Sequence, residues 1–237
     1  KLAAEQGDKY SKTCLAQMYE QGDFISKNKK EAQRLYTEAA EQGEAYALYK
    51  VAQMYYTGEG RVKDKKKALE LYEDAAINHR SGEAYYELGR FYEYGELVKT
   101  DKNQAAKFYR EAFMNYGFDN RLKIWKEALN ALERLAMQKC GDAAYYLGCL
   151  YYHAYMVEKN EKEAFKWCKM AMENGCENHN AAAMLSGMYE DGEGTEKDDE
   201  KSLYWIKESL RLQNEAYFKK HNINVEYDSE QNRAIIK

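Results

Sequence analysis

The sequence of 237 residues contains no proline. Average usage near 5% would place about 12 prolines in a chain of this length. Proline lacks a backbone N–H and breaks helix interiors, so its absence, with many Ala, Glu, Lys and Leu residues, predicts uninterrupted helices. Long hydrophobic runs are also missing. No run approaches the roughly 18 apolar residues that a membrane-spanning helix needs.

A marked excess of one charge sign is lacking as well. The chain carries 36 Lys and Arg against 40 Asp and Glu, a net charge of −4. This imbalance is too small for a disordered polyelectrolyte, and a 45% hydrophobic fraction is enough to build a core. Bulk phosphate binding needs clustered Lys and Arg, so we expect no nucleic-acid partner.

Cysteine and histidine are few and scattered. The five cysteines are an odd number without a CxxC pair, and the four histidines have no metal-ligand pattern. The cysteines are Cys14, Cys140, Cys149, Cys168 and Cys176. No nucleophile–base pair can be recognised. We therefore expect that the chain has no metal site, no cofactor and no enzymatic activity.

A short phrase recurs five times along the chain. Each copy has a large apolar residue, a small residue, a second apolar residue and Tyr at positions 0, +1, +3 and +4, which form one face of a helix. The copies begin at Leu15, Val51, Leu88, Leu147 and Leu185. Seven residues into each copy stands a glycine, or Ala154 in the fourth copy, which ends this helix.

A second helix is predicted after each of these stops. Asn or Asp stands six residues further on in all five copies, as a helix N-cap requires, namely Asn28, Asp64, Asp101, Asn160 and Asp198. Small residues follow at fixed offsets and let two helices approach closely. Each copy is therefore a hairpin of a helix A and a helix B, and the hairpins must stack because one alone cannot bury its apolar face.

These residues resemble the Sel1-like repeat family, relatives of the tetratricopeptide repeat. The clearest matches are VAQMYYTGEGRVKD at 51–64, LSGMYEDGEGTEKD at 185–198 and AAEQG at 39–43. The resemblance covers about residues 1–213. It implies an all-α fold, a right-handed α-α superhelix (solenoid) of about five hairpin repeats whose helices A line a concave face. It also implies protein–protein binding by an adaptor or regulator, or by an immunity protein that occludes a toxin or effector enzyme. A hydrolase with a site in the groove is the remaining alternative.

The predicted organisation is a single domain over 1–237. Residues 1–7 match the end of a preceding repeat, 8–43, 44–80 and 81–117 are repeats, 118–140 is an inserted helix, 141–177 and 178–213 are repeats, and 214–237 is a C-terminal cap or tail.

The inserted helix carries an apolar stripe of Leu122, Trp125, Leu129, Leu132, Leu135 and Ala136. Because one extra helix breaks the alternation of helices A and B, we expect a kink or register shift there. We expect a short capping helix over 215–221, and a tail that packs on the last repeat.

Three further sequence features have simple structural interpretations. A cysteine-rich branch of the family joins helices A and B by disulfides, but the corresponding positions here hold no cysteine. Cys168 takes the position that Tyr36, Tyr72 and Tyr109 hold in other copies, so we expect a packed thiol. The segments Gly-Glu-Gly at 58–60 and 192–194 lack a phosphate-loop ending and are interpreted as turns.

The candidate binding surface is the outer stripe of helix A. In the first copy we expect Ser11, Leu15 and Met18 in the core and Tyr10 and Thr13 on the stripe. Tyrosine offers a large contact area at low entropy cost and is enriched at interfaces, although tyrosine here could equally pack against the next repeat. The predicted partner-binding residues are Tyr49, Lys50, Gln53, Tyr56, Tyr86, Arg90, Glu93, Tyr145 and Tyr152. The interleaved glutamates disfavour single-stranded nucleic acid.

The compartment follows only from indirect features. Cysteine that is not arranged in pairs favours a reducing compartment, and so the cytoplasm. Lys1 is not a natural start, so a periplasmic, secreted or ER-lumenal location stays open if an N-terminal signal was removed.

Overall fold

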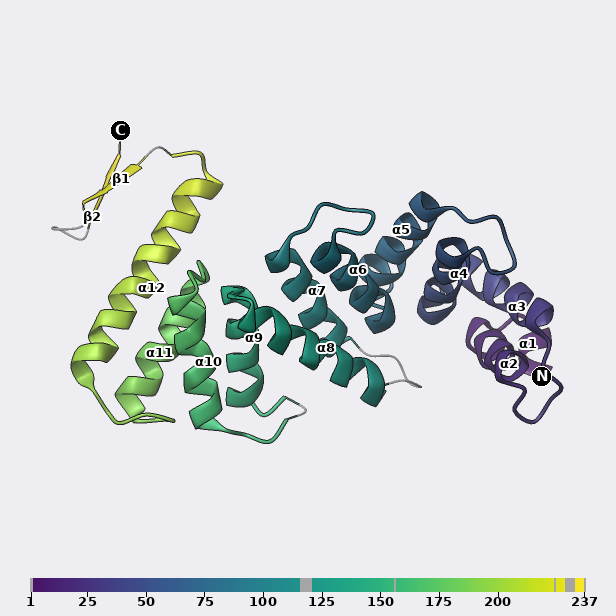
Figure 1. Cartoon of the computed structure of the whole chain (residues 1–237), viewed down its shortest axis with the longest axis horizontal. Coiled ribbons are helices and arrows are strands. Elements are labelled where there is room, and N and C mark those ends of the chain that lie inside the picture. Colours follow the sequence, from purple (N-terminus) through teal and green to yellow (C-terminus); the bar gives the residue numbers. More distant parts are fainter. Residues whose placement is uncertain (1, 116–120, 156, 224, 229–232, 237) are drawn as a thin grey trace. The chain divides into compact units, whose positions relative to one another are not determined.

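A computed structural model describes residues 2–115, 121–155, 157–223, 225–228 and 233–236; the side chains of Leu2, Arg121 and Leu122 and all side chains beyond Ile223 lie outside the description. The described residues form the helices α1 (Leu2–Glu5), α2 (Lys9–Gln21), α3 (Lys29–Glu41), α4 (Ala45–Thr57), α5 (Lys65–Glu73), α6 (Gly82–Tyr94), α7 (Lys102–Met114), α8 (Arg121–Met137), α9 (Gly141–Tyr152), α10 (Glu161–Glu173), α11 (His179–Asp191) and α12 (Asp199–Lys220) (Figure 1). A π-helical turn η1 (Asp74–Asn78) continues α5, and strands β1 (Val225–Asp228) and β2 (Arg233–Ile236) pair antiparallel. The predicted all-helical fold is confirmed, with this short hairpin added.

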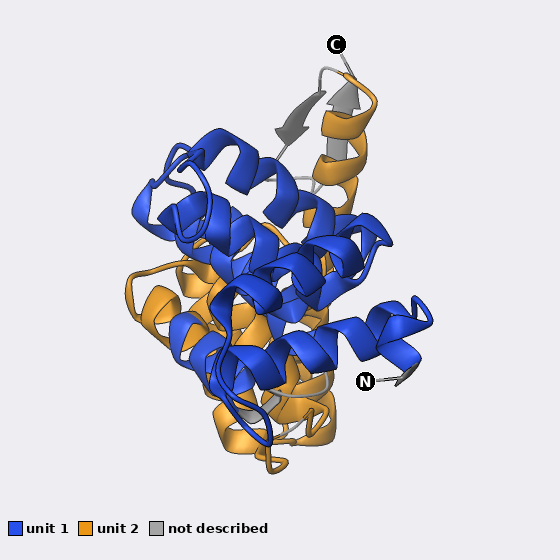
Figure 2. Cartoon of the chain, turned by 90° about the vertical axis from the view of Figure 1, so that its right-hand side faces the viewer, with its two compact units in different colours: residues 1–131 blue, residues 132–237 orange. Residues whose placement is uncertain are grey.

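The chain divides into two compact units, 1–131 and 132–237, coloured separately in Figure 2. In the first unit the hairpins α2/α3, α4/α5 and α6/α7 follow one another, and in the second α9/α10 and α11/α12 do so. The boundary falls within α8. The kink or register shift expected at this helix, like the single-domain boundaries, stays a prediction.

The loops between helices A and B form as the sequence predicts. Glycines 22, 58, 95 and 192 end helix A with φ between 71° and 86°, and Ala154 takes φ 54° in the fourth copy. Only a residue without Cβ adopts this left-handed conformation without steric cost. The five predicted N-caps accept a bond from the backbone N–H three residues on, at 2.9–3.1 Å. Each N-cap residue also donates its own N–H to the carbonyl of the repeated Tyr, at 2.9–3.2 Å, which closes the loop.

The core is a stack in which α3, α5 and α10 each pack between their own helix A and the helix A that follows. One buried cluster joins Ala16 of α2, Leu35 and Tyr36 of α3, and Val51 and Met54 of α4. The next cluster repeats this arrangement over α4, α5 and α6. The eighth residue after the N-cap of helix B is fully buried in the first four copies; these residues are Tyr36, Tyr72, Tyr109 and Cys168. The expected packing role of Cys168 is confirmed.

Glycine in helix A makes room for these large side chains. A Cβ on Gly89 would lie 2.7 Å from the Tyr109 ring, and a Cβ on Gly148 would lie 2.5 Å from Cys168 Sγ. The small residue of the repeated phrase is therefore required by the residue opposite it on helix B.

The inserted helix is confirmed as α8, but its buried stripe differs from the predicted one. Buried positions are Ile124, Ala128, Ala131, Leu132, Leu135 and Ala136, whereas Trp125 and Leu129 are half-buried and the side chain of Leu122 lies outside the description. The prediction placed the largest apolar side chains on the buried face. In the structure, alanines occupy much of this face because small side chains let α8 pack closely against its neighbours.

The C-terminal region differs from the prediction in one respect. Residues 215–220 extend α12 instead of forming a separate capping helix, because neither glycine nor proline occurs between Asp199 and Lys220. The packing of the tail on the last repeat concerns side chains outside the described residues and stays a prediction.

Candidate partner-binding groove

A groove of about 420 Å³ lies in the first unit between α4, α6 and α8. Its lining residues are Tyr46, Tyr49, Lys50 and Gln53 of α4, Glu83, Tyr86, Glu87 and Arg90 of α6, and Lys123, Ile124 and Glu127 of α8. Five of the nine predicted partner-binding residues are therefore brought together here: Tyr49, Lys50, Gln53, Tyr86 and Arg90.

The two helices A contribute equivalent positions. Residues 46, 49, 50 and 53 of α4 correspond to residues 83, 86, 87 and 90 of α6 at an offset of 37. A spacing of i, i+3, i+4 and i+7 keeps these residues on one helical face, opposite the face that carries the repeated apolar phrase. The stacking of the hairpins then aligns the two stripes, while α8 supplies a third wall.

The groove tyrosines pack against other aromatic rings on one side and line the groove on the other. Tyr49 contacts Tyr46 and Tyr72, with ring centroids 5.7 and 6.0 Å apart, and Tyr86 contacts Tyr109 at 5.5 Å. Tyr49 and Tyr86 are half-buried, while their partners Tyr72 and Tyr109 are fully buried. Burial raises the pKa of Tyr49 above the ordinary tyrosine value of about 10, so its hydroxyl keeps its proton into the alkaline range. The contacts with Tyr72 and Tyr109 restrict the two groove rings.

Charged groups of both signs surround the rings. Arg90 Nη1 lies 2.9 Å from Glu87 Oε2, and Lys50 Nζ lies 2.6 Å from Oε1 of Glu20 on α2. Burial raises the pKa of Glu87 despite its pairing with Arg90. The groove lining holds three glutamates and three cationic side chains, so neither sign of charge predominates.

Two predicted residues of the first unit support helix packing instead of lining the groove. Tyr56 stacks on Phe91 with centroids 5.6 Å apart, and its hydroxyl is hydrogen-bonded to Glu96. Glu93 accepts a hydrogen bond of 2.6 Å from the Tyr109 hydroxyl.

The other two predicted residues belong to the second unit. Tyr145 contacts Tyr146 at 5.6 Å, and Tyr152 contacts the ring of His153 edge-on at 5.0 Å. Both tyrosines are half-buried. A ladder of tyrosines through both units stays a prediction.

The structure also corrects the expected faces of α2. Thr13, expected on the outer stripe, is 7% exposed, whereas Met18, expected in the core, is 38% exposed. Thr13 is buried because its hydroxyl meets Glu44 of the next repeat, while no complete hairpin precedes α2 among the described residues to cover Met18.

Sequence reasoning missed two parts of the groove lining, one on the helices A and one on the inserted helix. Tyr46 and Glu83 lie one turn before the predicted stripes, so extending the i−3 spacing by one turn would have found them. Lys123, Ile124 and Glu127 come from the inserted helix, which has no counterpart in another copy to fix its orientation.

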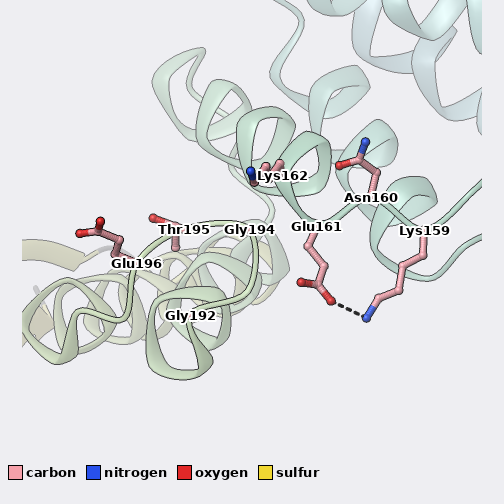
Figure 3. Close-up of a pocket in the computed structure, with 8 residues that line it drawn as sticks. All are labelled: Lys159, Asn160, Glu161, Lys162, Gly192, Gly194, Thr195 and Glu196. Atoms are coloured by element: carbon pink, nitrogen blue, oxygen red, sulfur yellow. Dashed lines mark hydrogen bonds and ion pairs between the residues drawn. The ribbon is translucent and has the colours of Figure 1, made fainter.

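A wider depression of about 720 Å³ in the second unit is lined by Lys159, Asn160, Glu161, Lys162, Gly192, Gly194, Thr195 and Glu196 (Figure 3). Asn160 caps α10, and Lys159 Nζ lies 2.7 Å from Glu161 Oε1, so these side chains serve the helix start. A Cβ on Gly194 would lie 2.0 Å from the Glu161 carbonyl oxygen, which shows how closely the turn backbone packs there. The Gly-Glu-Gly segment acts as a turn.

No cluster of three or more His, Cys, Asp or Glu side chains that could hold a metal ion occurs in the described part of the chain. Among the helices of the described residues, none combines the length and the apolar character that crossing a membrane requires. The five cysteines are thiols, of which Cys140, Cys168 and Cys176 are buried.

Comparison with protein families identifies the repeat. The family described as Sel1 repeat matches five segments, 15–44, 45–78, 82–115, 141–176 and 179–214. The chain belongs to the Sel1 repeat family. Sel1 repeats are a protein-interaction fold, so the groove lies on the kind of scaffold that binds other proteins.

Solved structures with Sel1 repeats resemble the chain. A Sel1 repeat protein from Oxalobacter formigenes is 25% identical with a TM-score of 0.44, covering 90% of this chain and 77% of that chain. The c5321 protective antigen of uropathogenic Escherichia coli, with an SLR fold, is 25% identical with a TM-score of 0.43, covering 91% and 47%. The immunity protein Pa5087 from Pseudomonas aeruginosa is 20% identical with a TM-score of 0.36, covering 86% and 81%. The comparison with curated proteins returns no match.

Proposed function

We propose that this Sel1 repeat chain is a non-enzymatic adaptor or regulator that binds a protein or peptide segment in the groove between α4, α6 and α8. The observation that carries the proposal is the convergence of Tyr46, Tyr49 and Tyr86 with charged residues of both signs on one concave surface. Half-buried tyrosines give an interface a rigid, amphipathic contact area at little cost in side-chain entropy.

The packing beneath the rings prepares the groove for binding. Tyr49 rests on Tyr72 and Tyr86 rests on Tyr109, so neither ring must be immobilised when a partner arrives. The ion pairs Arg90–Glu87 and Lys50–Glu20 then fix the direction in which charges point into the groove. In this arrangement the tyrosines supply affinity, and the charges select the orientation and identity of the partner.

The experiment compares the partners that wild-type and variant chains retain from cells of the source organism, quantified by mass spectrometry. The groove variant is Tyr49→Ala with Tyr86→Ala. The matched control is Phe24→Ala with Tyr204→Ala, because these side chains are 97% and 60% exposed and do not line the groove. We expect the groove variant to lose a partner that the control retains. Retention of every partner by the groove variant would contradict the proposal.

A second variant separates binding from folding, because truncating two packed rings can weaken the first unit. Lys123→Glu changes the charge of the groove at a side chain that is 71% exposed and leaves the core untouched. We expect it to lower partner recovery while the far-UV circular dichroism spectrum and the melting temperature stay those of the wild type.

A further inference from the structure

One face of α12, the last helix, exposes a stripe of large apolar side chains. Leu203, Ile206 and Leu210 are 54%, 40% and 53% exposed. Their spacing of three and four residues places them on one side of the helix over about 10 Å of its length. Soluble chains rarely leave such a row uncovered without a use.

The same three positions are covered in every earlier repeat. They are the fifth, eighth and twelfth residues after the N-cap of helix B. The eighth residue is at most 1% exposed in the other four copies, where it is Tyr36, Tyr72, Tyr109 or Cys168. The fifth and twelfth residues are buried or half-buried in these copies; they are Gln33 and Ala40, Leu69 and Ala76, Ala106 and Phe113, and Phe165 and Met172. Exposure of the whole set occurs only in the fifth copy.

A helix A covers these positions wherever another Sel1 repeat follows directly. Tyr72 of α5 meets Phe91 of α6 at 5.6 Å, and Phe165 of α10 meets Tyr189 of α11 edge-on at 5.2 Å. The covering face has a regular composition, with a small residue followed four and seven residues later by large apolar ones. These triplets are Ala47, Val51 and Met54 on α4, and Ala84, Leu88 and Phe91 on α6.

We infer that the Leu203–Ile206–Leu210 stripe is a docking surface for an amphipathic helix of a partner protein with this same small–large–large pattern. The argument is continuity with the stacking interface, because α12 presents the positions that bind a helix A and no described helix occupies them. This surface is separate from the groove, so its occupation does not depend on the proposed groove function.

The test uses a fluorescein-labelled, hydrocarbon-stapled peptide with the sequence of residues 82–94, which is the helix that covers α5. The staple joins positions 86 and 90, away from the face formed by Ala84, Leu88 and Phe91. A staple is needed because an isolated helix of 13 residues is marginal in water. The peptide is titrated with the full 237-residue chain and followed by fluorescence anisotropy.

We expect saturable binding that Ile206→Glu with Leu210→Glu weakens at least tenfold. The matched control is Tyr204→Glu, which changes a 60% exposed ring on a different face of the same helix and should leave the affinity unchanged. A stapled peptide with Leu88→Glu should bind at least tenfold more weakly to the wild-type chain. Circular dichroism confirms that the α12 variants stay folded.

Three results would overturn the inference. One is the absence of saturable binding to the wild-type chain, and another is equal affinity of the wild type and the Ile206/Leu210 variant. The third is a dimer detected by light scattering that the Ile206/Leu210 variant converts to a monomer, since this would assign the stripe to a second copy of the chain.

Discussion

Thr13 of α2 donates a hydrogen bond of 2.8 Å to Oε2 of Glu44, which stands at the start of the next helix A. The same carboxylate caps α4 by accepting the backbone N–H of Ala47 at 2.7 Å. Both side chains are buried, at 7% exposure each. One acidic group therefore caps the start of α4 and ties this helix to the preceding repeat.

Replacing Glu44 with Ala should destabilise the first unit by about 1–3 kcal/mol, because the change removes a cap and leaves the Thr13 hydroxyl without this acceptor. Urea unfolding followed by circular dichroism measures the change. Glu41→Ala, at an exposed position at the end of α3, should shift stability by no more than about 0.5 kcal/mol. Equal effects of the two substitutions would show that the capping bond contributes nothing.

A second prediction contrasts two glycines of α11. Gly192 ends the helix at φ +76°, so Gly192→Ala should cost about 1–2 kcal/mol. Gly187 lies inside the helix, and a Cβ there would meet nothing within 4 Å, so Gly187→Ala should stabilise by up to about 1 kcal/mol.

Ala154 provides the reverse test, since it takes φ 54° where the other copies have glycine. Ala154→Gly should stabilise the second unit by roughly 1 kcal/mol. Thermal unfolding of the three single variants gives the sign in each case, and a loss of stability in Ala154→Gly would refute the steric explanation.

The features that the sequence predicts correctly are ones that recur from copy to copy. Five N-caps, four glycine stops and the buried position of Cys168 each recur at fixed offsets, so one copy informs another. The residues that α8 contributes to the groove could not be predicted. The rotation of this helix about its own axis is set by its packing, and no equivalent helix occurs in another copy for comparison. The role of Glu44 as a buried helix cap was not predicted, for a related reason. The equivalent caps are Asp8, Ser81, Cys140 and Asn178, and their chemistry varies too much to reveal a buried carboxylate.

The cysteines should differ sharply in reactivity. Cys14 is exposed, whereas Cys168 is fully buried beneath Gly148, and burial raises the pKa of its thiol. Brief treatment of the native chain with iodoacetamide at pH 8 should modify Cys14 and leave Cys168 intact, as read by peptide mass spectrometry. In urea all five should react. Rapid native labelling of Cys168 would mean that α9 and α10 separate readily.

Buried tyrosines should make the chain sensitive to alkali. Burial raises the pKa of Tyr36, Tyr49 and Tyr72 in the folded chain. Well below pH 10 these hydroxyls are protonated in both the folded and the unfolded chain, and they do not change the stability with pH. Above roughly pH 10 the unfolded chain releases protons that the folded chain retains, so the free energy of unfolding falls as pH rises, by up to about 1.4 kcal/mol per pH unit for each such group.

Tyr72→Phe isolates one of these groups, because Phe keeps the ring contact with Phe91 and has no hydroxyl to ionise. Urea unfolding between pH 9 and 11.5 should show a shallower loss of stability for Tyr72→Phe than for the wild type. Tyr204→Phe, in which the substituted ring is exposed, should leave the wild-type slope unchanged. If Tyr72→Phe and the wild type lose stability in parallel, the Tyr72 hydroxyl ionises without unfolding the chain, and the packing between α5 and α6 must then admit water on the side of the groove.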